Sequence, residues 1–403
     1  MDSSQFDSPQ SAPDYPTVVL RPGADHRIRR GHLWIFSNEL KDGFQALPSG
    51  AAVRVTDAKG KFWGVGTINP HSLIAVRLFS RTPDLLNEPL LRARIKAAAD
   101  LRKRLLGNDE TVYRLIYSEA DGLPGLIVDR FESVFVIQSN TAGMDRLLPI
   151  VTKILKTEFA PTAIVAANDA SVRELEGLKL HREVIFGCLD GVCRFEQDGL
   201  QLLADPLKGQ KTGFFLDQRF NRRMAASLVQ SSDRVLDLFC YTGAFGLYAL
   251  KAGADQVTFV DASDIALANT REAVKLNGFS DSGEFIRADI FDYLKTDTEQ
   301  FDWVLLDPPA LAKSRSKVPA GLRAYRDLNA RAIKKVCPGG FLATSSCSGL
   351  VASEHWYDAL RQAAEKAGRR LRFVAHGTQG PDHPILSAMP ETQYLKFAIA
   401  IVD

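Results

Sequence analysis

The chain contains 403 residues, of which 45% are hydrophobic and 24% charged, and its formal net charge is +2. This length predicts two or three domains, and the composition is that of a globular protein rather than a disordered or fibrous one. No apolar run approaches the ~20 residues that a membrane-spanning helix requires. Five cysteines, an odd number, argue against a disulfide framework, and none of them forms a zinc-binding pattern. We therefore expect a cytoplasmic protein without a membrane partner or a metal.

The first half of the chain is expected to hold a polar tail and two domains. Residues 1–16 are rich in Ser, Asp and Pro and predict a disordered tail. Residues 17–82 alternate short apolar runs with turn residues, which predicts a small β domain. Residues 83–205 mix strand-like runs with helical ones, including Glu88–Leu106 ended by Gly107, and predict a mixed α+β domain.

Two basic clusters are candidates for contact with a polyanion. The first lies in the small β domain, where four arginines stand against Asp25 alone. The second opens a basic stretch in the last third of the chain. Such clusters are often only solvated surface, but two of them in one chain favour a nucleic-acid partner. The residues concerned are Arg21, Arg27, Arg29, Arg30, Lys313, Arg315 and Lys317.

From residue 206 to residue 403 the pattern changes to alternating helices and apolar strands. This alternation predicts a Rossmann-like α/β domain with a doubly wound parallel sheet and helices on both faces. Ligands bind at the carboxyl edge of such sheets. The strands are expected at Arg234–Leu238, Gln256–Val260, Glu284–Arg287, Trp303–Leu306, Gly340–Thr344, Leu371–Ala375 and Tyr394–Val402.

A glycine-containing turn follows the first of these strands and predicts a nucleoside site. Asp237 precedes the turn, and Gly243 stands where the next helix begins, so free backbone amides would face a ligand. Asp261 ends the second strand, where a carboxylate can hold both ribose hydroxyls, and Asp289 ends the third. The simpler interpretation of each aspartate is a helix cap. The turn lacks the paired early glycines of a dinucleotide site, so S-adenosylmethionine fits better.

Asp307 and Cys347 are the strongest candidates for catalysis. Asp307, followed by two prolines, ends one apolar run, and Cys347 follows another in a small polar loop. If the two strands are parallel neighbours, both residues emerge side by side at one edge of the sheet. A thiolate can add to C6 of a pyrimidine and activate C5, while a carboxylate stabilises charge at N3. A buried structural thiol and a rigid turn are the simpler interpretations.

The motifs DLFCYTGAFG, VDAS, ADIFDYL, LLDPPAL and SCS, in this order, resemble those of class I S-adenosylmethionine-dependent methyltransferases. More narrowly, the chain resembles the bacterial large-subunit (23S) ribosomal RNA cytosine-C5 methyltransferases, in which an N-terminal PUA domain and a central domain precede the catalytic domain. The segment Lys211–Arg219 matches the one that helps to hold the methionine end of the cofactor in that family. The resemblance thereby implies cofactor contacts by Lys211, Gln218, Arg219 and Pro308.

The resemblance does not identify the residue that removes the C5 proton. Other RNA cytosine-C5 enzymes carry a second cysteine where this chain has Ala310. A related uracil-C5 family uses a glutamate in a late loop that contains proline, which favours Glu391 over Asp382 and His383. The expected partner is ribosomal RNA or the ribosomal subunit. Uracil C5 or guanine as the target, and a non-catalytic assembly protein, remain the alternatives.

Overall fold

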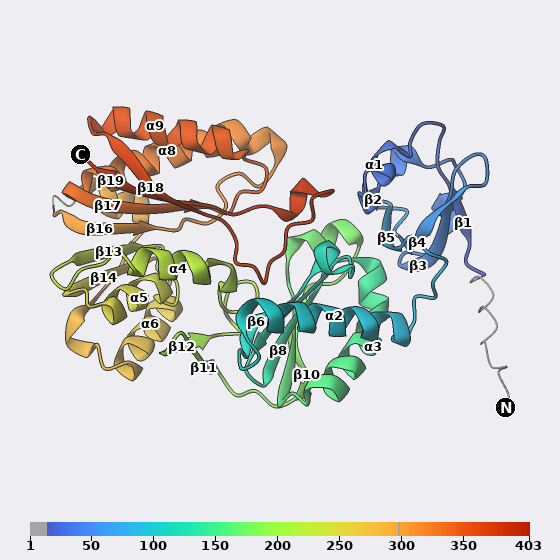
Figure 1. Cartoon of the computed structure of the whole chain (residues 1–403), viewed down its shortest axis with the longest axis horizontal. Helices are drawn as coiled ribbons and strands as arrows, with labels where there is room; N and C mark the ends of the chain where they lie inside the picture. Colours follow the sequence, from blue (N-terminus) through green and yellow to red (C-terminus); the bar gives the residue numbers. More distant parts are fainter. Residues whose placement is uncertain (1–13, 297–298) are drawn as a thin grey trace, which may run out of the picture. The chain divides into compact units, whose positions relative to one another are not determined.

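The computed structural model describes residues 14–296 and 299–403 of the chain (Figure 1). Most of the tail predicted at 1–16 therefore lies outside the described residues. The predicted domain boundaries at 82/83 and 205/206 stay predictions. The described chain forms two compact units. The first unit contains the described residues up to Glu110 with Leu115–Cys188 and Leu386–Met389, and the second contains Thr111–Arg114, Leu189–Ile385 and Pro390–Asp403.

The first unit opens with a five-stranded sheet in the order β1-β3-β4-β5-β2. Strands β3, β4 and β5 pair antiparallel, and β1 lies parallel to β3. Alternate residues such as Val53 and Val55 point into a core that also contains Leu20 and Leu78. The elements are β1 (Thr17–Val19), α1 (His26–Arg29), β2 (Trp34–Ile35), β3 (Ala51–Thr56), β4 (Phe62–Ile68) and β5 (Val76–Ser80).

The second sheet of this unit has the order β10-β9-β8-β7-β6. The helix predicted at Glu88–Leu106 is confirmed as α2: the side chain of Asn87 accepts a hydrogen bond from the Leu90 N–H at its start, and Gly107 ends it. The other elements are β6 (Val112–Tyr117), β7 (Leu126–Phe131), β8 (Val134–Ser139), α3 (Ala142–Phe159), β9 (Ala163–Asn168) and β10 (His181–Gly187).

Glu176 joins the two sheets of the first unit. Its carboxylate, almost fully buried, accepts hydrogen bonds from Asn69 Nδ2 (2.8 Å), Ser72 Oγ (3.0 Å) and an Arg77 guanidinium nitrogen (3.1 Å). A fourth comes from the Ala142 N–H at the start of α3 (3.3 Å). Three of these donors belong to the β domain, so this buried ion pair holds the β domain against the helix and sheet that come after it in the chain.

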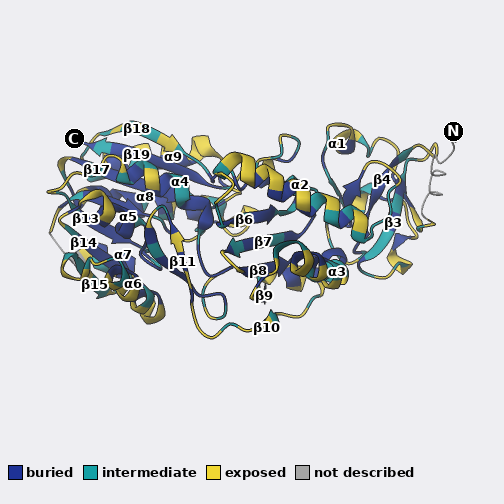
Figure 2. Ribbon diagram, turned by 60° about the horizontal axis from the view of Figure 1, so that its bottom comes forward, coloured by how far each residue is buried: buried dark blue, intermediate teal, exposed yellow. Residues whose placement is uncertain are grey.

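The second unit contains a seven-stranded sheet in the order β15-β14-β13-β16-β17-β19-β18. Helices α4, α5 and α6 cover one face, and α8 and α9 cover the other (Figure 1), where α7 packs against α8. The inner strands of this sheet are largely buried on both sides, as their dark blue colour in Figure 2 shows, whereas the edge strands β15 and β18 are partly exposed. The sequence predicts a wholly parallel sheet, and this detail is wrong: β19 runs antiparallel to both of its neighbours.

The strands predicted for this part of the chain are all present, although β17 begins four residues earlier than predicted. The elements are β11 (Cys193–Gln197), β12 (Leu200–Ala204), α4 (Arg219–Ala226), β13 (Arg234–Leu238), α5 (Ala244–Ala252), β14 (Gln256–Asp261), α6 (Asp264–Leu276), β15 (Gly283–Arg287), α7 (Ile290–Thr296), β16 (Phe301–Leu306), α8 (Val318–Lys334), β17 (Val336–Ser346), α9 (Ser353–Ala367), β18 (Leu371–Gly377) and β19 (Lys396–Val402).

Strand β13 lies where the strand order reverses, between β14 on one side and β16 on the other. The crevice at the carboxyl end of such a strand is the usual ligand site of open α/β sheets. Strands β16 and β17 are parallel neighbours, with Leu306 paired to Thr344. The expectation that Asp307 and Cys347 emerge at the same edge is therefore confirmed. None of the helices within the described ranges is long and apolar enough to span a membrane.

The Glu176 network generates a stability prediction. Glu176→Ala leaves the buried Arg77 guanidinium without its carboxylate, which is expected to lower the free energy of unfolding of the first unit by about 3–5 kcal/mol. Urea unfolding monitored by hydrogen exchange of peptides from the first unit measures this loss. Glu174→Ala, an exposed glutamate in the same 3-10 helix, should change the midpoint little, and an equal effect of both substitutions would contradict the prediction.

Candidate functional site

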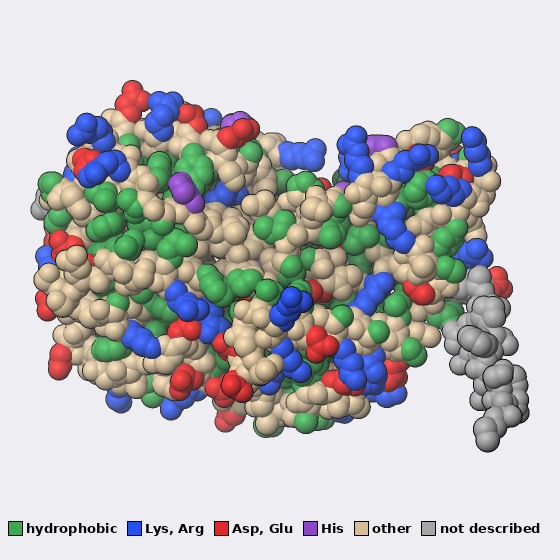
Figure 3. Space-filling model, in the orientation of Figure 1, with side chains coloured by type: hydrophobic (Ala, Val, Ile, Leu, Met, Phe, Trp, Pro, Cys, Tyr) green, Lys and Arg blue, Asp and Glu red, His purple; other side chains and the backbone are tan. Residues whose placement is uncertain are grey.

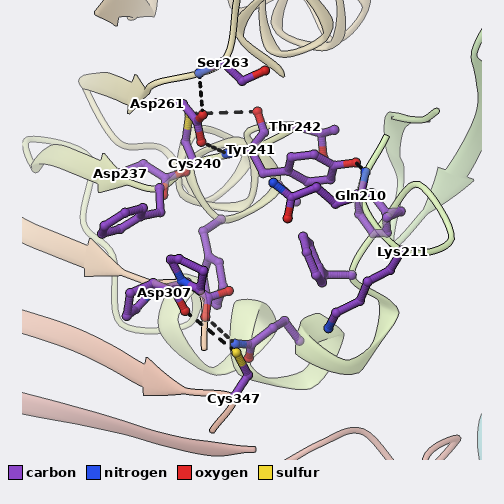
Figure 4. A pocket seen from close by; sticks show the side chains of 18 of the residues that line it. Gln210, Lys211, Asp237, Cys240, Tyr241, Thr242, Asp261, Ser263, Asp307 and Cys347 are labelled. Atoms are coloured by element: carbon purple, nitrogen blue, oxygen red, sulfur yellow. Dashed lines mark hydrogen bonds between the residues drawn. The ribbon is translucent and has the colours of Figure 1, made fainter. Parts of the chain in front are cut away.

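A cavity of about 610 Å³ opens at the carboxyl ends of β13, β14, β16 and β17 (Figure 4). It is enclosed by residues of the second unit alone. Eight of the site residues predicted from sequence line it, coming from segments as far apart in the chain as residues 211 and 347. They are Lys211, Gln218, Asp237, Asp261, Asp289, Asp307, Pro308 and Cys347.

The turn after β13 has an unusual backbone that places helix α5 at the cavity. Phe239 and Tyr241 adopt left-handed conformations, with φ of 58° and 52°, and Gly243 has a φ of 73°. A Cβ atom at Gly243 would lie 2.3 Å from Thr270 Cγ2, so no larger side chain fits. Non-glycine residues in this region are strained and occur preferentially at functional sites. Gly243 itself caps α5, and the neighbouring Ala244 reaches the cavity.

The aspartates at the strand ends hold the backbone, as helix caps do, and also face the cavity, as ligand-binding residues do. Asp261 accepts hydrogen bonds from the Tyr241 N–H (3.0 Å) and the Ser263 N–H (2.8 Å), and so fixes the turn. Asp289 accepts one from the Asp292 N–H (3.2 Å) at the start of α7. A carboxylate has about four acceptor positions, so both residues retain capacity for a ligand while they order the backbone.

Asp237 is the most deeply buried acid of the cavity. Its carboxyl is 2% exposed and accepts a hydrogen bond from the Gly246 N–H (2.9 Å). Burial raises the pKa of Asp237 to about 8, the Gly246 hydrogen bond opposes this rise, and the charge of Asp307 adds to it. In the free protein this group therefore carries a proton near neutral pH.

The segment before β13 differs from the prediction at one position. Arg219, predicted to contact the cofactor, does not line the cavity, because its guanidinium is held by Asp198 at 2.6 and 3.1 Å. Arg222 lines it instead, and its guanidinium donates to the Phe215 carbonyl (2.9 Å). On helix α4 the position of Arg222, four residues after Gln218, puts it on the same face. That spacing is the signal in the sequence that would have identified it.

Asp217 is a second cavity residue that was not predicted from the sequence. It lies in the 3-10 helix Leu216–Gln218, lines the cavity and is 6% exposed. Its Oδ2 accepts a hydrogen bond from Tyr394 Oη (2.5 Å). Although burial opposes ionisation, the nearby charges of Lys211 and His383 lower the pKa of Asp217. The cavity therefore has a permanent negative charge close to Cys347.

Asp307 and Cys347 both line the cavity, at the ends of the adjacent strands β16 and β17. Asp307 Oδ1 accepts hydrogen bonds from Gln218 Nε2 (3.0 Å) and from Ser345 Oγ. Burial raises the pKa of Asp307 to about 6, while the Ser345 hydrogen bond opposes that rise. Cys347 Sγ lies 3.9 Å from the Pro308 carbonyl oxygen.

The Cys347 thiol is protonated in the free protein. Burial raises its pKa to about 11, the ammonium of Lys211 opposes that rise, and the carboxylates of Asp307 and Asp217 add to it. Any reaction that needs the thiolate must therefore supply positive charge near the sulfur or remove negative charge from its surroundings.

The three candidates for the base that removes the C5 proton do not line the cavity. Glu391 is exposed in the 3-10 helix Pro390–Thr392 and does not line the cavity. Asp382 and His383 are buried and contact each other through Oδ1 and Nδ1 at 2.9 Å, also outside the cavity lining. The structure does not bring Glu391 to Cys347, so its role as the base stays a prediction without geometric support.

The predicted RNA-contacting residues are exposed on both units. On the β domain, where Figure 3 shows several blue Lys and Arg side chains, Arg21, Arg27, Arg29 and Arg30 are solvent-exposed. Arg29 contacts Asp25 Oδ2 at 2.6 Å, and Arg27 stacks on Phe36. On the second unit, the exposed residues Lys313, Arg315 and Lys317 lie in the segment between the cavity residue Ala310 and helix α8.

Known proteins share both the sequence and the fold of this chain. Residues 18–81 match the model of PUA-like domains, and residues 189–397 match that of S-adenosylmethionine-dependent methyltransferases. The ribosomal RNA large subunit methyltransferase I of Pseudoalteromonas atlantica is 37% identical over 96% of this chain and 99% of its own. The enzyme of that name from Photobacterium profundum is 38% identical over 94% and 98%.

Two solved structures are similar over 96% of this chain and 100% of their own. One is described as a SAM-dependent methyltransferase from Streptococcus mutans, with a TM-score of 0.81, and the other as a methyltransferase complexed with SAH, with a TM-score of 0.82. Both are 17% identical, so this likeness concerns the fold. The predicted Rossmann-like methyltransferase fold, with a PUA-like domain at its amino end, is confirmed.

The cavity lining fits S-adenosylmethionine, which carries a sulfonium and an ammonium group. Among the described residues, five aspartates line the cavity against two basic side chains, Lys211 and Arg222. Within the same ranges, Asp217 Oδ1 and Arg222 Nε are buried without a hydrogen-bond partner. Buried polar atoms of this kind are costly unless a ligand satisfies them. An acidic cavity with unsatisfied polar atoms suits a ligand with positive charge and its own carboxylate.

The raised pKa of Asp237 predicts that cofactor binding releases a proton. Positive charge on the ligand favours the carboxylate, so the pKa of Asp237 falls below its free value of about 8 on binding. The affinity for S-adenosylmethionine is therefore expected to rise with pH from about 6 to 8 and then to level off, by at most tenfold per pH unit. Calorimetry in two buffers with different ionisation enthalpies measures the proton.

The matched control is Asp289→Asn, which should keep both the rise and the proton release, whereas Asp237→Asn should lose them. Asp289 lines the same cavity but is exposed to solvent, unlike the buried Asp237. A flat affinity between pH 6 and 8 in the unmodified protein would show that Asp237 does not ionise on binding.

Proposed function

The chain belongs to the S-adenosylmethionine-dependent methyltransferase family and uses S-adenosylmethionine as its cofactor, and we propose that it methylates C5 of a cytosine in large-subunit ribosomal RNA. One observation carries the proposal: Asp307 and Cys347 line one cofactor-sized cavity at the ends of adjacent strands. Methyl transfer to an amino group or a ring nitrogen needs no thiol. A thiol beside a carboxylate is what C5 of a pyrimidine needs.

In the proposed reaction Cys347 first activates the ring. Its thiolate sulfur forms a bond to C6, the electrons of the ring double bonds shift towards N3, and N3 takes up a proton. C5 then has enamine character and can accept a methyl group. When bound, S-adenosylmethionine supplies that methyl group from its sulfonium. A base then removes the C5 proton, and the electrons of that C–H bond restore the C5–C6 double bond. The bond between C6 and the Cys347 sulfur breaks, the sulfur leaves as the thiolate, and N3 gives up the proton that it had taken.

Asp307 is proposed to move the proton at N3. A carboxyl group with a pKa of about 6 is divided between its two forms near neutral pH, so it can give a proton to N3 and take it back. The hydrogen bonds from Gln218 and Ser345 hold one carboxylate oxygen in place. The other carboxylate oxygen remains free to contact the target cytosine. That cytosine must be turned out of the RNA stack to reach the cavity.

The ribosomal RNA substrate is proposed from the relatives and from the surface charge. Two relatives that span almost the whole chain are named as large-subunit ribosomal RNA methyltransferases. The exposed arginines of the PUA-like domain supply positive charge for phosphates. Recognition of RNA by shape suits a docking domain that is separate from the catalytic one.

Removing the thiol tests the covalent step. Cys347→Ala is expected to abolish formation of 5-methylcytidine in ribosomal RNA while S-adenosylmethionine still binds, because the ring can no longer be activated. RNA containing 5-fluorocytidine, which cannot lose a proton from C5, should form an adduct with the unmodified enzyme that survives denaturing electrophoresis. Cys337→Ala, at the other end of strand β17, should retain both activities. Turnover by Cys347→Ala, or another nucleoside as the product, would contradict the proposal.

Salt dependence tests RNA docking by the PUA-like domain. Replacing Arg27, Arg29 and Arg30 by Gln is expected to weaken RNA binding and to reduce the slope of log affinity against log salt by about 2–3, if each contacts one phosphate. Affinity for S-adenosylmethionine should not change. The same substitution at Arg361, an exposed residue of α9, is the control. An unchanged slope in the triple variant would assign these arginines to solvated surface.

A further inference from the structure

Lys396 is a buried lysine whose ammonium is held by backbone carbonyl groups. It is the first residue of β19 and is 8% exposed. Its Nζ donates three hydrogen bonds, to the carbonyl oxygens of Ser348 (2.9 Å), Val351 (2.9 Å) and Tyr394 (3.0 Å). Within residues 14–296 and 299–403 no carboxylate forms an ion pair with it. Lysines are almost never buried unless a partner neutralises them, so this arrangement calls for a function.

The carbonyl groups that Lys396 holds belong largely to the loop that carries Cys347. Strand β17 ends at Ser346, which pairs directly with Lys396 across the antiparallel ladder. The loop then runs from Cys347 past Val351 to helix α9. An ammonium has three donors, and Lys396 uses two of them on the loop that carries the thiol and the third on the Tyr394 carbonyl just before β19. Lys396 therefore ties the Cys347 loop to the start of β19.

A second set of hydrogen bonds fixes the same loop from the opposite side. Ser348 Oγ accepts from the Ala312 N–H (3.2 Å) and contacts Tyr325 Oη (2.9 Å). Ala312 lies in the loop that follows Asp307. Ser348 thus links the Asp307 loop to the Cys347 loop through its side chain, while its carbonyl group is held by Lys396. Together these contacts set the position of the thiol relative to the carboxylate.

The charges around Cys347 leave few sources of positive potential. Asp307 and Asp217 oppose ionisation of the thiol and raise its pKa, Lys211 favours ionisation, and Tyr325 lies on the α8 side. Lys396 adds a cation from β19, where burial lowers its pKa to about 8 and interaction with Cys347 raises it. Its ammonium form therefore predominates at neutral pH. Formation of a thiolate would stabilise that form further, because the interaction is mutual.

We propose that Lys396 is a positioning residue for Cys347: its hydrogen bonds hold the thiol loop to the start of β19, and its charge stabilises the thiolate. This inference rests on the proposed role of Cys347 as the nucleophile. The acidic cavity lacks positive charge for a thiolate, and the proposal assigns part of that charge to Lys396, which does not line the cavity.

Alkylation of Cys347 by iodoacetamide tests the proposal without RNA. The rate depends on the thiolate fraction. In the full-length Lys396→Met protein the rate at Cys347, measured by peptide mass spectrometry at pH 7, should fall by about tenfold, which corresponds to a thiol pKa about one unit higher. Exposed Cys188 in the same sample is the internal control. Lys396→Arg, which keeps the charge, should restore a large part of the rate.

The direction of the change separates the proposal from a purely structural role. If Lys396 only stabilised the fold, its loss would loosen the loop and leave alkylation of Cys347 unchanged or faster. Either result in a variant that still binds S-adenosylmethionine would overturn the proposal. If Lys396→Met no longer binds the cofactor, the uncharged Lys396→Gln, which keeps two donors, decides by the same measurement.

A parallel measurement of 5-methylcytidine formation separates this inference from the proposed function. Slower alkylation together with a lower kcat and an unchanged KM for S-adenosylmethionine supports both. Slower alkylation in a chain whose unmodified form produces no 5-methylcytidine would refute the cytosine target and leave the effect of Lys396 on the thiol standing. Normal alkylation and normal turnover in Lys396→Met would refute the inference alone.

Discussion

The parallel pairing of β16 and β17 is the constraint on which the candidate site depends. With Leu306 paired to Thr344, the two strands leave the sheet at the same edge, so the residues after each strand must share that edge. Asp307 comes directly after β16, and Cys347 comes directly after β17. A shift of the register by one residue would turn every side chain of a strand to the opposite face, so the register of this strand pair also decides which side chains meet at the cavity.

The acidity of the cavity explains several of its unusual properties together. Carboxylates at four strand ends and in the 3-10 helix before α4 suit a cationic cofactor, but they also repel one another. Burial and this repulsion raise the pKa of Asp237 to about 8 and that of Asp307 to about 6. The same field opposes a thiolate at Cys347 by raising the pKa of its thiol. Affinity for a positive ligand and reactivity of the thiol therefore conflict until positive charge enters or approaches the cavity.

Much of this arrangement could be predicted from the sequence, because it depends on strand ends. An apolar run followed by Asp identifies a strand and its carboxyl edge at once, and Asp237, Asp261, Asp289 and Asp307 all line the cavity as predicted. Residues on helices were predicted less well. Arg219 and Arg222 are equally basic, and only the helical rotation decides that Arg219 pairs with Asp198 while Arg222 faces the cavity. The positions of loop residues are harder still to predict from sequence. No periodicity indicates where the Glu391 side chain points, and in the structure it is exposed. The sequence pattern could not predict the antiparallel direction of β19 either, because a strand that is buried on both faces has the same apolar pattern in either direction.

The direction of β19 has a consequence for the site. A parallel strand reaches the carboxyl edge of the sheet with its last residue, but an antiparallel strand begins there with its first. Lys396 is that first residue, paired with Ser346 at the end of β17, so its side chain starts beside the loop of Cys347. The reversed direction of β19 thus places the buried Lys396 at the same edge of the sheet as the aspartates that follow the other strands. The fold itself thereby provides the counterpart that a thiolate in this cavity requires.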